Sequence, residues 1–307
     1  MTKTARTICP WQLRKHTLEL GRRTLVMGVV NVTPDSFSDG GLFIDPEDAV
    51  AHGLQLLDEG ADLLDLGAES TRPGSRAGGA AGTAAAPAVS ADEEQARLLP
   101  VLEGILKARP EAVVSVDTYK AATTRAALAA GAEIINDVSG FCWDSGLAPV
   151  CAEFGCGVVL MHTRGRPEEW RAQAQLEPDE LLAEVRAGLA ASLSTAAAEG
   201  VAAEAIVLDP GYGFGKRFDE NYALLARQAE LLALGRPLLA GLSRKSFLGR
   251  TLAPLHGGED APVEARETAS VAALVAAILE GASIVRVHKV RAAVEAARIA
   301  DALLAAQ

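Results

Sequence analysis

The stretches Val114-Ser115-Val116-Asp117 and Ile134-Ile135-Asn136-Asp137 decide how this sequence is expected to fold. Each is a short apolar run that ends on a polar side chain, and enough residues lie between the two for a helix. A strand buried on both faces of a parallel sheet has this continuous apolar character. Its polar residue then emerges at the carboxyl end of the strand, where α/β folds place their chemistry.

The same arrangement recurs along the chain, with helical patterns between the apolar runs. Eight strand-helix pairs predict one α/β domain, a (β/α)8 TIM barrel. An open doubly wound sheet is the competing architecture. The expected strands span residues 24–31, 62–68, 112–117, 133–137, 157–161, 205–209, 237–242 and 283–287.

Local signals mark the ends of several helices. Asp45 followed by Pro46 suits the start of the first helix, and Gly60 suits its end. Ser90 and Glu93 form a capping-box signature for the second helix, although we expect Pro100 to delay or kink its start. The later helices are expected near residues 119–130, 145–154, 179–199, 218–234, 263–280 and 291–306.

Two long loops interrupt the barrel pattern. Residues 31–41 are dense in turn formers, and residues 76–89 are an Ala/Gly-rich run with side chains too small to pack. We therefore expect long mobile loops after strands one and two. Residues 1–23 are expected to form an N-terminal lead-in with a small hairpin, and residues 24–307 the barrel domain.

The composition limits the classes of function. Of the 307 residues, 49% are hydrophobic and only 4% aromatic, so small aliphatic side chains must fill a large core. The net charge of −11 argues against a nucleic-acid partner, which usually requires a basic surface. An anionic substrate remains compatible, because a local cationic cluster can outweigh an acidic exterior. The candidates for that cluster are Arg72, Lys245, Arg286 and His288.

The cysteines and the hydropathy pattern indicate a cytoplasmic protein with no membrane partner. The spacing of the cysteines fits neither a zinc site nor a disulfide framework, and we expect free thiols in a reducing compartment. No apolar segment of a signal peptide follows the basic N-terminal residues. No run approaches the roughly 20 apolar residues of a membrane span.

Polar residues at strand ends predict a site for a flat heterocycle. Asp117, Asn136 and Asp209 supply two carboxylates and an amide that can pair with ring N–H donors. Lys245 can meet an acceptor such as a ring nitrogen or a carbonyl oxygen. In a barrel, inward residues at the strand ends converge on one pocket.

A second group of residues suits an oxyanion or a phosphate. Arg286 and His288 alternate on the last strand, and Asn31 ends the first. The glycine-rich segment 211–216 matches neither the P-loop spacing nor the dinucleotide fingerprint. A Ser-His-Asp hydrolase is not indicated either, because the sequence lacks a nucleophile elbow.

The chain resembles the dihydropteroate synthase family along nearly its whole length. The resemblance implies that 6-hydroxymethyl-7,8-dihydropterin pyrophosphate reacts with 4-aminobenzoate to give 7,8-dihydropteroate and pyrophosphate in folate biosynthesis. It also implies that the C–O bond breaks first and leaves a pterin cation. The matching segments, in order, are 28–41, 65–74, 115–118, 135–137, 161–162, 208–216, 243–246 and 286–288.

The resemblance also implies roles for individual residues. Mg²⁺ would lie near Asn31, with Asp35 as a second candidate ligand. The catalytic group would comprise Asp117, Asp209, Lys245, Arg286, His288 and Arg72. The pterin would lie among Asp117, Asn136, Met161, Asp209 and Lys245, and the pyrophosphate among Asn31, Arg72, Arg286 and His288. The aminobenzoate site would use Phe37, Thr71, Pro73, Phe214 and Ser246.

Two alternatives share the barrel and the pterin site. A methyltetrahydrofolate-corrinoid methyltransferase would not need the pyrophosphate residues, and a non-catalytic pterin-binding protein would be expected to have lost motif residues. The resemblance further implies a homodimer formed by late helices. A small-residue face that would permit close helix packing, but that suits ordinary barrel packing equally, comprises Ala265, Ala269, Ala272, Ala273 and Ala276.

Overall fold

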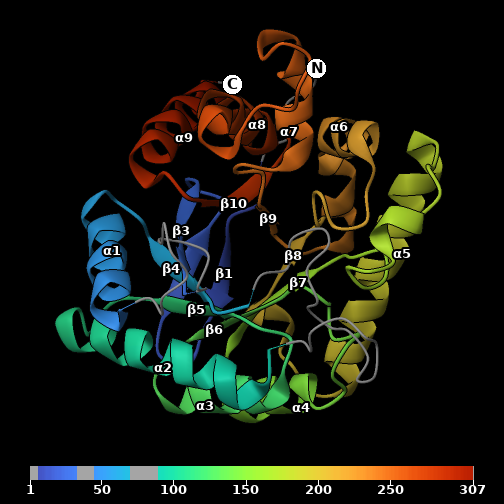
Figure 1. The fold of residues 1–307 in the computed structure, drawn as a ribbon. Coiled ribbons are helices and arrows are strands. Elements are labelled where there is room, and N and C mark those ends of the chain that lie inside the picture. Colours follow the sequence, from blue (N-terminus) through green and yellow to red (C-terminus); the bar gives the residue numbers. More distant parts are fainter. Residues whose placement is uncertain (1–5, 33–44, 70–88, 307) are drawn as a thin grey trace.

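The computed structural model describes residues 6–32, 45–69 and 89–306. Eight parallel strands close into a barrel in the order β10-β3-β4-β5-β6-β7-β8-β9, and helices form a ring around it (Figure 1). The predicted TIM barrel is confirmed, and the open sheet is wrong. The barrel strands are β3 (Leu25–Asn31), β4 (Leu63–Gly67), β5 (Val114–Asp117), β6 (Ile134–Asp137), β7 (Gly157–Met161), β8 (Ile206–Asp209), β9 (Leu238–Ala240) and β10 (Ala282–Val287).

Each barrel strand is followed by at least one helix. Two helices, α7 and α8, follow β9. The helices are α1 (Pro46–Asp58), α2 (Ala91–Ala108), α3 (Ala121–Ala129), α4 (Leu147–Phe154), α5 (Pro178–Ala198), α6 (Phe218–Ala226), α7 (Ser246–Thr251), α8 (Glu267–Leu279) and α9 (Val290–Ala305).

The helix starts follow the predicted caps. The side chain of Asp45 accepts a hydrogen bond from the backbone N–H of Glu47, and Ser90 accepts one from Glu93. The expectation for Pro100 is wrong as to the start of the helix, because α2 begins at Ala91 and contains this proline. The Ser90 cap satisfies a free N–H group at that start, so the helix does not depend on Pro100 to begin.

Two predicted helices are shorter than expected. The helix predicted for 218–234 ends at Ala226 and continues as a 3₁₀ helix, Gln228–Leu234. The break coincides with the buried side chain of Gln228, which accepts a hydrogen bond from Tyr212 and donates to Ala277 of α8. The helix predicted for 263–280 likewise begins with a 3₁₀ turn before α8.

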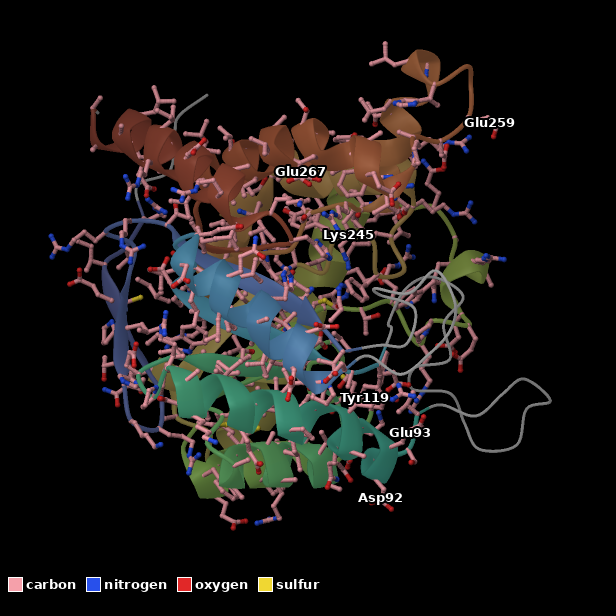
Figure 2. All side chains as sticks on the ribbon, turned by 60° about the vertical axis from the view of Figure 1, so that its left-hand side comes forward. Asp92, Glu93, Tyr119, Lys245, Glu259 and Glu267 are labelled. Carbon is pink, nitrogen blue, oxygen red and sulfur yellow. The ribbon has the colours of Figure 1, made fainter. Side chains whose placement is uncertain are left out.

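Several acidic side chains lie on the exterior. Asp92 and Glu93 are exposed on the first turn of α2, and Glu259 is exposed in the loop between α7 and α8 (Figure 2). Within the described residues, no helix is long and apolar enough to cross a membrane.

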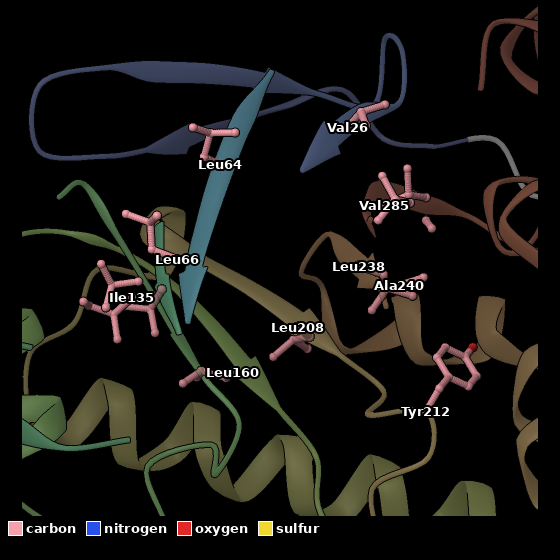
Figure 3. Packing of buried hydrophobic residues seen from close by; sticks show 14 of the residues in the cluster. Val26, Leu64, Leu66, Ile135, Leu160, Leu208, Tyr212, Leu238, Ala240 and Val285 are labelled. Atoms are coloured by element: carbon pink, nitrogen blue, oxygen red, sulfur yellow. The ribbon is translucent and has the colours of Figure 1, made fainter. Parts of the chain in front are cut away.

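Side chains of each strand point alternately toward the helices and toward the barrel axis. Leu64 and Leu66 of β4 pack outward, in the large core between strands and helices (Figure 3). Leu63 belongs instead to the core inside the barrel. Asp65 lies between Leu64 and Leu66 in the strand, so it also points inward, one layer above Leu63.

The N-terminal hairpin closes the amino end of the barrel. It consists of β1 (Cys9–Gln12) and β2 (Thr17–Leu20), paired antiparallel, and the indole N–H of Trp11 donates to the carbonyl of Ala205 at 2.8 Å. Its side chains pack on the lowest inward residues of the strands, a layer that we call the floor. The floor comprises Trp11, Leu13, Leu20, Leu25, Met27, Leu63, Val113, Ile134, Val159, Val207, Leu239 and Ile284.

We predict that Trp11→Ala destabilises the protein by about 3–5 kcal/mol, because it opens a cavity in the floor. Urea unfolding followed by circular dichroism measures this change. Ile8→Ala serves as the control, since Ile8 is 54% exposed whereas Trp11 is 1% exposed. Equal midpoints for the two variants would contradict the assigned role of the floor.

Candidate active site

Polar side chains replace apolar ones two residues above the floor. Asn136 follows Ile134, Asp209 follows Val207, and Arg286 follows Ile284, each two positions along its strand. The period of two therefore directs these polar side chains toward the barrel axis. The predicted convergence of the polar residues at the strand ends depends on this alternation of side-chain direction. Asp117 joins them, since it is the register partner of Asn136 on the neighbouring strand.

The guanidinium of Arg286 lies between two carboxylates. Its Nε donates to Oδ2 of Asp65 at 2.6 Å, and its Nη2 donates to Oδ2 of Asp117 at 2.9 Å. Burial raises the pKa of Asp117 to about 7, although Arg286 opposes the shift and Asp65 adds to it. The site therefore holds a carboxyl group that titrates near neutrality.

Asp65 also contacts two neighbours from adjacent strands. Its Oδ2 accepts from Nδ2 of Asn136 at 2.9 Å, and its Oδ1 accepts from the Ser115 hydroxyl at 2.7 Å. Asp65 was not predicted as a site residue from the sequence. The available signal was a carboxylate in the middle of the apolar run 63–66, because a buried charge needs partners.

Asp209 and Lys245 form a second charged group, next to Phe214. Oδ1 of Asp209 accepts from the N–H of Gly211 at 2.7 Å, and Nζ of Lys245 lies 4.0 Å from the centre of the Phe214 ring. Burial lowers the pKa of Lys245 to about 8, with Asp209 opposing and Arg286 adding to the shift. In Figure 2 Lys245 lies on the side of α7 and α8.

An apolar wall borders these charged residues. Met161, at the end of β7, clusters with Tyr119 and Val138, and Trp143 and Phe214 pack against the cluster. Tyr119 and Trp143 meet edge to face, with ring centres 5.1 Å apart. A flat ligand ring that hydrogen bonds to the carboxylates at its edge would find apolar side chains for its faces.

Lys216 ends the glycine-rich segment 211–216. Its side chain is buried and stabilises this loop. Its Nζ donates to the carbonyls of Gly211 at 2.8 Å, His162 at 3.1 Å and Phe214 at 3.4 Å. Burial lowers the pKa of this lysine to about 7. Lys216 thus sets the backbone from which Phe214 reaches Lys245.

The remaining predicted residues lie around the same end of the barrel. His288 follows β10, and its Nδ1 lies 3.0 Å from the hydroxyl of Ser243. Asn31 is the half-buried last residue of β3, and Ser246 is the exposed first residue of α7. The predicted mobile loops and the residues Asp35, Phe37, Thr71, Arg72 and Pro73 lie outside the described residues.

A buried ion-pair cluster lies beside the site, and the sequence analysis did not foresee it. Nζ of Lys120 lies 2.5 Å from Oε2 of Glu69 and 3.2 Å from Oε2 of Glu94. Burial alone would lower the pKa of Lys120, but Glu94 and Glu69 together raise it. The other oxygen of Glu69 accepts from the N–H of Val89 at 3.3 Å, so residues 69 and 89 are held together.

This fold and site are those of a barrel protein whose polar residues suit a flat heterocycle and an anion. The family model described as "Pterin binding enzyme" matches residues 27–288. The dihydropteroate synthase of Mycobacterium leprae is 46% identical over 281 residues, covering 91% of this chain and 93% of the relative. That of Escherichia coli K12 is 41% identical, covering 92% of each. The chain belongs to the dihydropteroate synthase family of pterin-binding enzymes, which are transferases.

Solved structures of this family share the whole fold. The dihydropteroate synthase of Xanthomonas albilineans with 4-aminobenzoic acid is 41% identical, with a TM-score of 0.83, covering 97% of this chain and 99% of that chain. The enzyme of Burkholderia cenocepacia complexed with 7,8-dihydropteroate is 40% identical, with a TM-score of 0.79, covering 97% and 98%. The family expected from the sequence motifs is confirmed.

We predict that Lys216→Met lowers the free energy of unfolding by about 1–3 kcal/mol, because buried carbonyl oxygens lose their donor. Urea unfolding measures the change. The control is Lys107→Met on the exposed face of α2, which should change the value by less than about 0.5 kcal/mol. If the two variants were equally stable, the loop-holding role of Lys216 would be refuted.

Proposed function

We propose that this chain condenses 6-hydroxymethyl-7,8-dihydropterin pyrophosphate with 4-aminobenzoate, giving 7,8-dihydropteroate and pyrophosphate. The convergence of Asp117, Asn136, Asp209 and Lys245 around one end of the barrel carries this proposal. The family relatives bound to 4-aminobenzoic acid and to 7,8-dihydropteroate support it. The methyltransferase alternative has no support among the relatives named above.

In this proposal the pterin is recognised by hydrogen bonds at its edge and by packing on its faces. Asp117 and Asp209 accept ring N–H groups, and Asn136 adds a further polar contact. Lys245 donates to a ring acceptor, and Met161 lies against the ring. The pairing of several fixed donors and acceptors with one heterocycle discriminates strongly against rings with a different hydrogen-bond pattern.

The residues can also stabilise the charges that develop during the reaction. The C–O bond to pyrophosphate breaks first, and the leaving group takes the electron pair. Asp117 and Asp209 stabilise the positive charge left on the pterin, while Arg286, His288 and Arg72 stabilise the departing pyrophosphate. The aniline nitrogen then attacks the exocyclic carbon, and the new C–N bond forms with loss of one proton.

We propose Mg²⁺ as the cofactor, with Asn31 as its protein ligand. The amide oxygen of Asn31 is the hard oxygen donor that Mg²⁺ prefers, and the described residues contain no cluster of three or more His, Cys, Asp or Glu that could hold a metal. Mg²⁺ typically binds through few protein oxygens together with substrate phosphates, so Asn31 would share the ion with the pyrophosphate. When bound, it would neutralise charge on the pyrophosphate.

The aminobenzoate is proposed to bind near Phe214 and Ser246, together with Phe37, Thr71 and Pro73. The position of Phe214 between Lys245 and Trp170 supports its part, since this ring is held on two sides. The assignment of Phe37, Thr71 and Pro73 rests on the family motifs.

We also propose a homodimer and a reducing, cytoplasmic location. Free thiols at all four cysteines, Cys9, Cys142, Cys151 and Cys156, support the location. The alanine face suggested for the dimer needs one correction. Ala273 is buried in the barrel core, whereas Ala272 is exposed, so the five alanines do not share one outer face.

The first test is release of pyrophosphate by the purified chain with Mg²⁺ and the pterin pyrophosphate, with and without 4-aminobenzoate. We expect release coupled to formation of dihydropteroate. Binding of the pterin pyrophosphate without any release would instead identify a non-catalytic pterin-binding protein.

We predict that kcat/KM falls on the acidic side of about pH 7, roughly tenfold per pH unit, as Asp117 becomes protonated. The sign follows because only the ionised carboxylate stabilises a cation and this form is lost below its pKa. Burial also raises the pKa of Asp209, which acts in the same direction. Asp117→Asn should lower kcat by about 100-fold and move the midpoint away from neutrality. A midpoint that stays in place in this variant would exclude Asp117 as its origin.

A further inference from the structure

We propose that Asp65 is a positioning residue that sets the orientation of both Arg286 and Asn136 through one carboxylate oxygen. This inference deepens the proposed function and rests on it, because it assigns to Asp65 the preorganisation of the pterin and pyrophosphate contacts.

The placement of Asp65 prevents direct contact with a ligand. Its side chain is 0% exposed. Asp65 is the register partner of Ser115, whereas Asp117 is the partner of Gly67, two residues nearer the carboxyl end. Asp65 therefore lies one inward layer below Asp117, and it can influence a ligand only through the side chains that it holds.

The hydrogen bond to Asp65 determines whether the NH₂ group or the oxygen of the Asn136 amide remains available to a ligand. The NH₂ group of Asn136 donates to Oδ2 of Asp65 at 2.9 Å, and an amide donates only through this group. The amide oxygen must then point the other way. Asn136 accordingly offers an acceptor, and it selects a ring edge that carries an N–H donor.

The same oxygen fixes the guanidinium plane of Arg286. Nε is held by Asp65 and Nη2 by Asp117, so rotation about the last side-chain bonds is blocked from two sides. No hydrogen bond to Nη1 is found within residues 6–32, 45–69 and 89–306. That group is left to donate to an oxyanion in a plane set before the ligand arrives.

The principal experiment is Asp65→Asn, which keeps the size of the side chain but removes its charge and one acceptor. The amide oxygen can replace only one of the two carboxylate oxygens, and because it is neutral it holds the Arg286 guanidinium more weakly than a carboxylate does. We expect kcat/KM for the pterin pyrophosphate to fall about 100-fold, as misplaced contact groups commonly cause. Binding of this substrate, measured by calorimetry without 4-aminobenzoate, should weaken as well.

The matched control is Ser115→Ala, which removes one hydrogen bond to Asp65 and leaves its charge and its bonds to Arg286 and Asn136 intact. Its kcat/KM should stay within about threefold of the natural chain. Comparable losses in the two variants would mean that general disturbance of the barrel interior, not orientation, causes the effect, and would overturn the proposal.

A double-mutant cycle separates positioning from a purely structural role. If Asp65 acts partly through Arg286, the fold loss of kcat/KM caused by Asp65→Asn must be at least about tenfold smaller in an Arg286→Ala background than in the natural chain. An equal loss in both backgrounds would overturn the proposal.

Should Asp65→Asn melt below the assay temperature, Arg286→Lys carries the test, since it keeps the charge but loses the Nε contact. It should lose activity to a similar extent, and retention within about threefold would also overturn the proposal.

The outcomes distinguish this inference from the proposed function. Substrate binding without turnover in the natural chain would refute the proposed function alone, and the binding data would still test Asp65. Normal turnover and binding in Asp65→Asn would refute the positioning role alone.

Discussion

The pairing of one guanidinium with two carboxylates is the constraint on which the rest of the site depends. Arg286 reaches from β10 past β3 to Asp65 on β4 and Asp117 on β5, so it joins strands that are not neighbours. Buried ion pairs contribute little net stability, because desolvation offsets the attraction between the charges. The contribution of this cluster is therefore geometric, since it sets where a cation, an amide and a titratable carboxyl lie relative to each other.

The residues that form the apolar floor and the polar residues of the proposed site lie at different levels along the same strands. In β3, for example, Met27 belongs to the floor, while Asn31 ends the strand among the proposed ligands. The hairpin closes the floor from below, and it leaves the carboxyl end of the barrel as the side for substrates. An apolar core and a charged site can thus coexist in one sheet, because the period of two places both apolar and polar side chains at successive inward positions of the same strands.

Much of this organisation could be predicted from the sequence, because continuous apolar runs with polar ends are a direct consequence of parallel strands buried on both faces. Asp117, Asn136 and Asp209 were predicted as site residues in this way. Asp65 was missed because it interrupts its apolar run instead of ending it, so a search for polar residues at strand ends does not reach it. The end of α6 at Ala226 was missed for a related reason, since the partners of Gln228 are distant in sequence.

The contact between Glu69 and Val89 has a consequence for how this chain tolerates change. Lys120 holds Glu69, and Glu69 in turn holds the backbone at Val89, so the exit from β4 and the approach to α2 are fastened together independently of what lies between them. For a segment closed between fixed ends, each doubling of length costs only about 0.6 kcal/mol in closure entropy. Insertions between residues 69 and 89 can therefore accumulate at little thermodynamic cost, which makes this the place where related chains can diverge in length without disturbing the barrel.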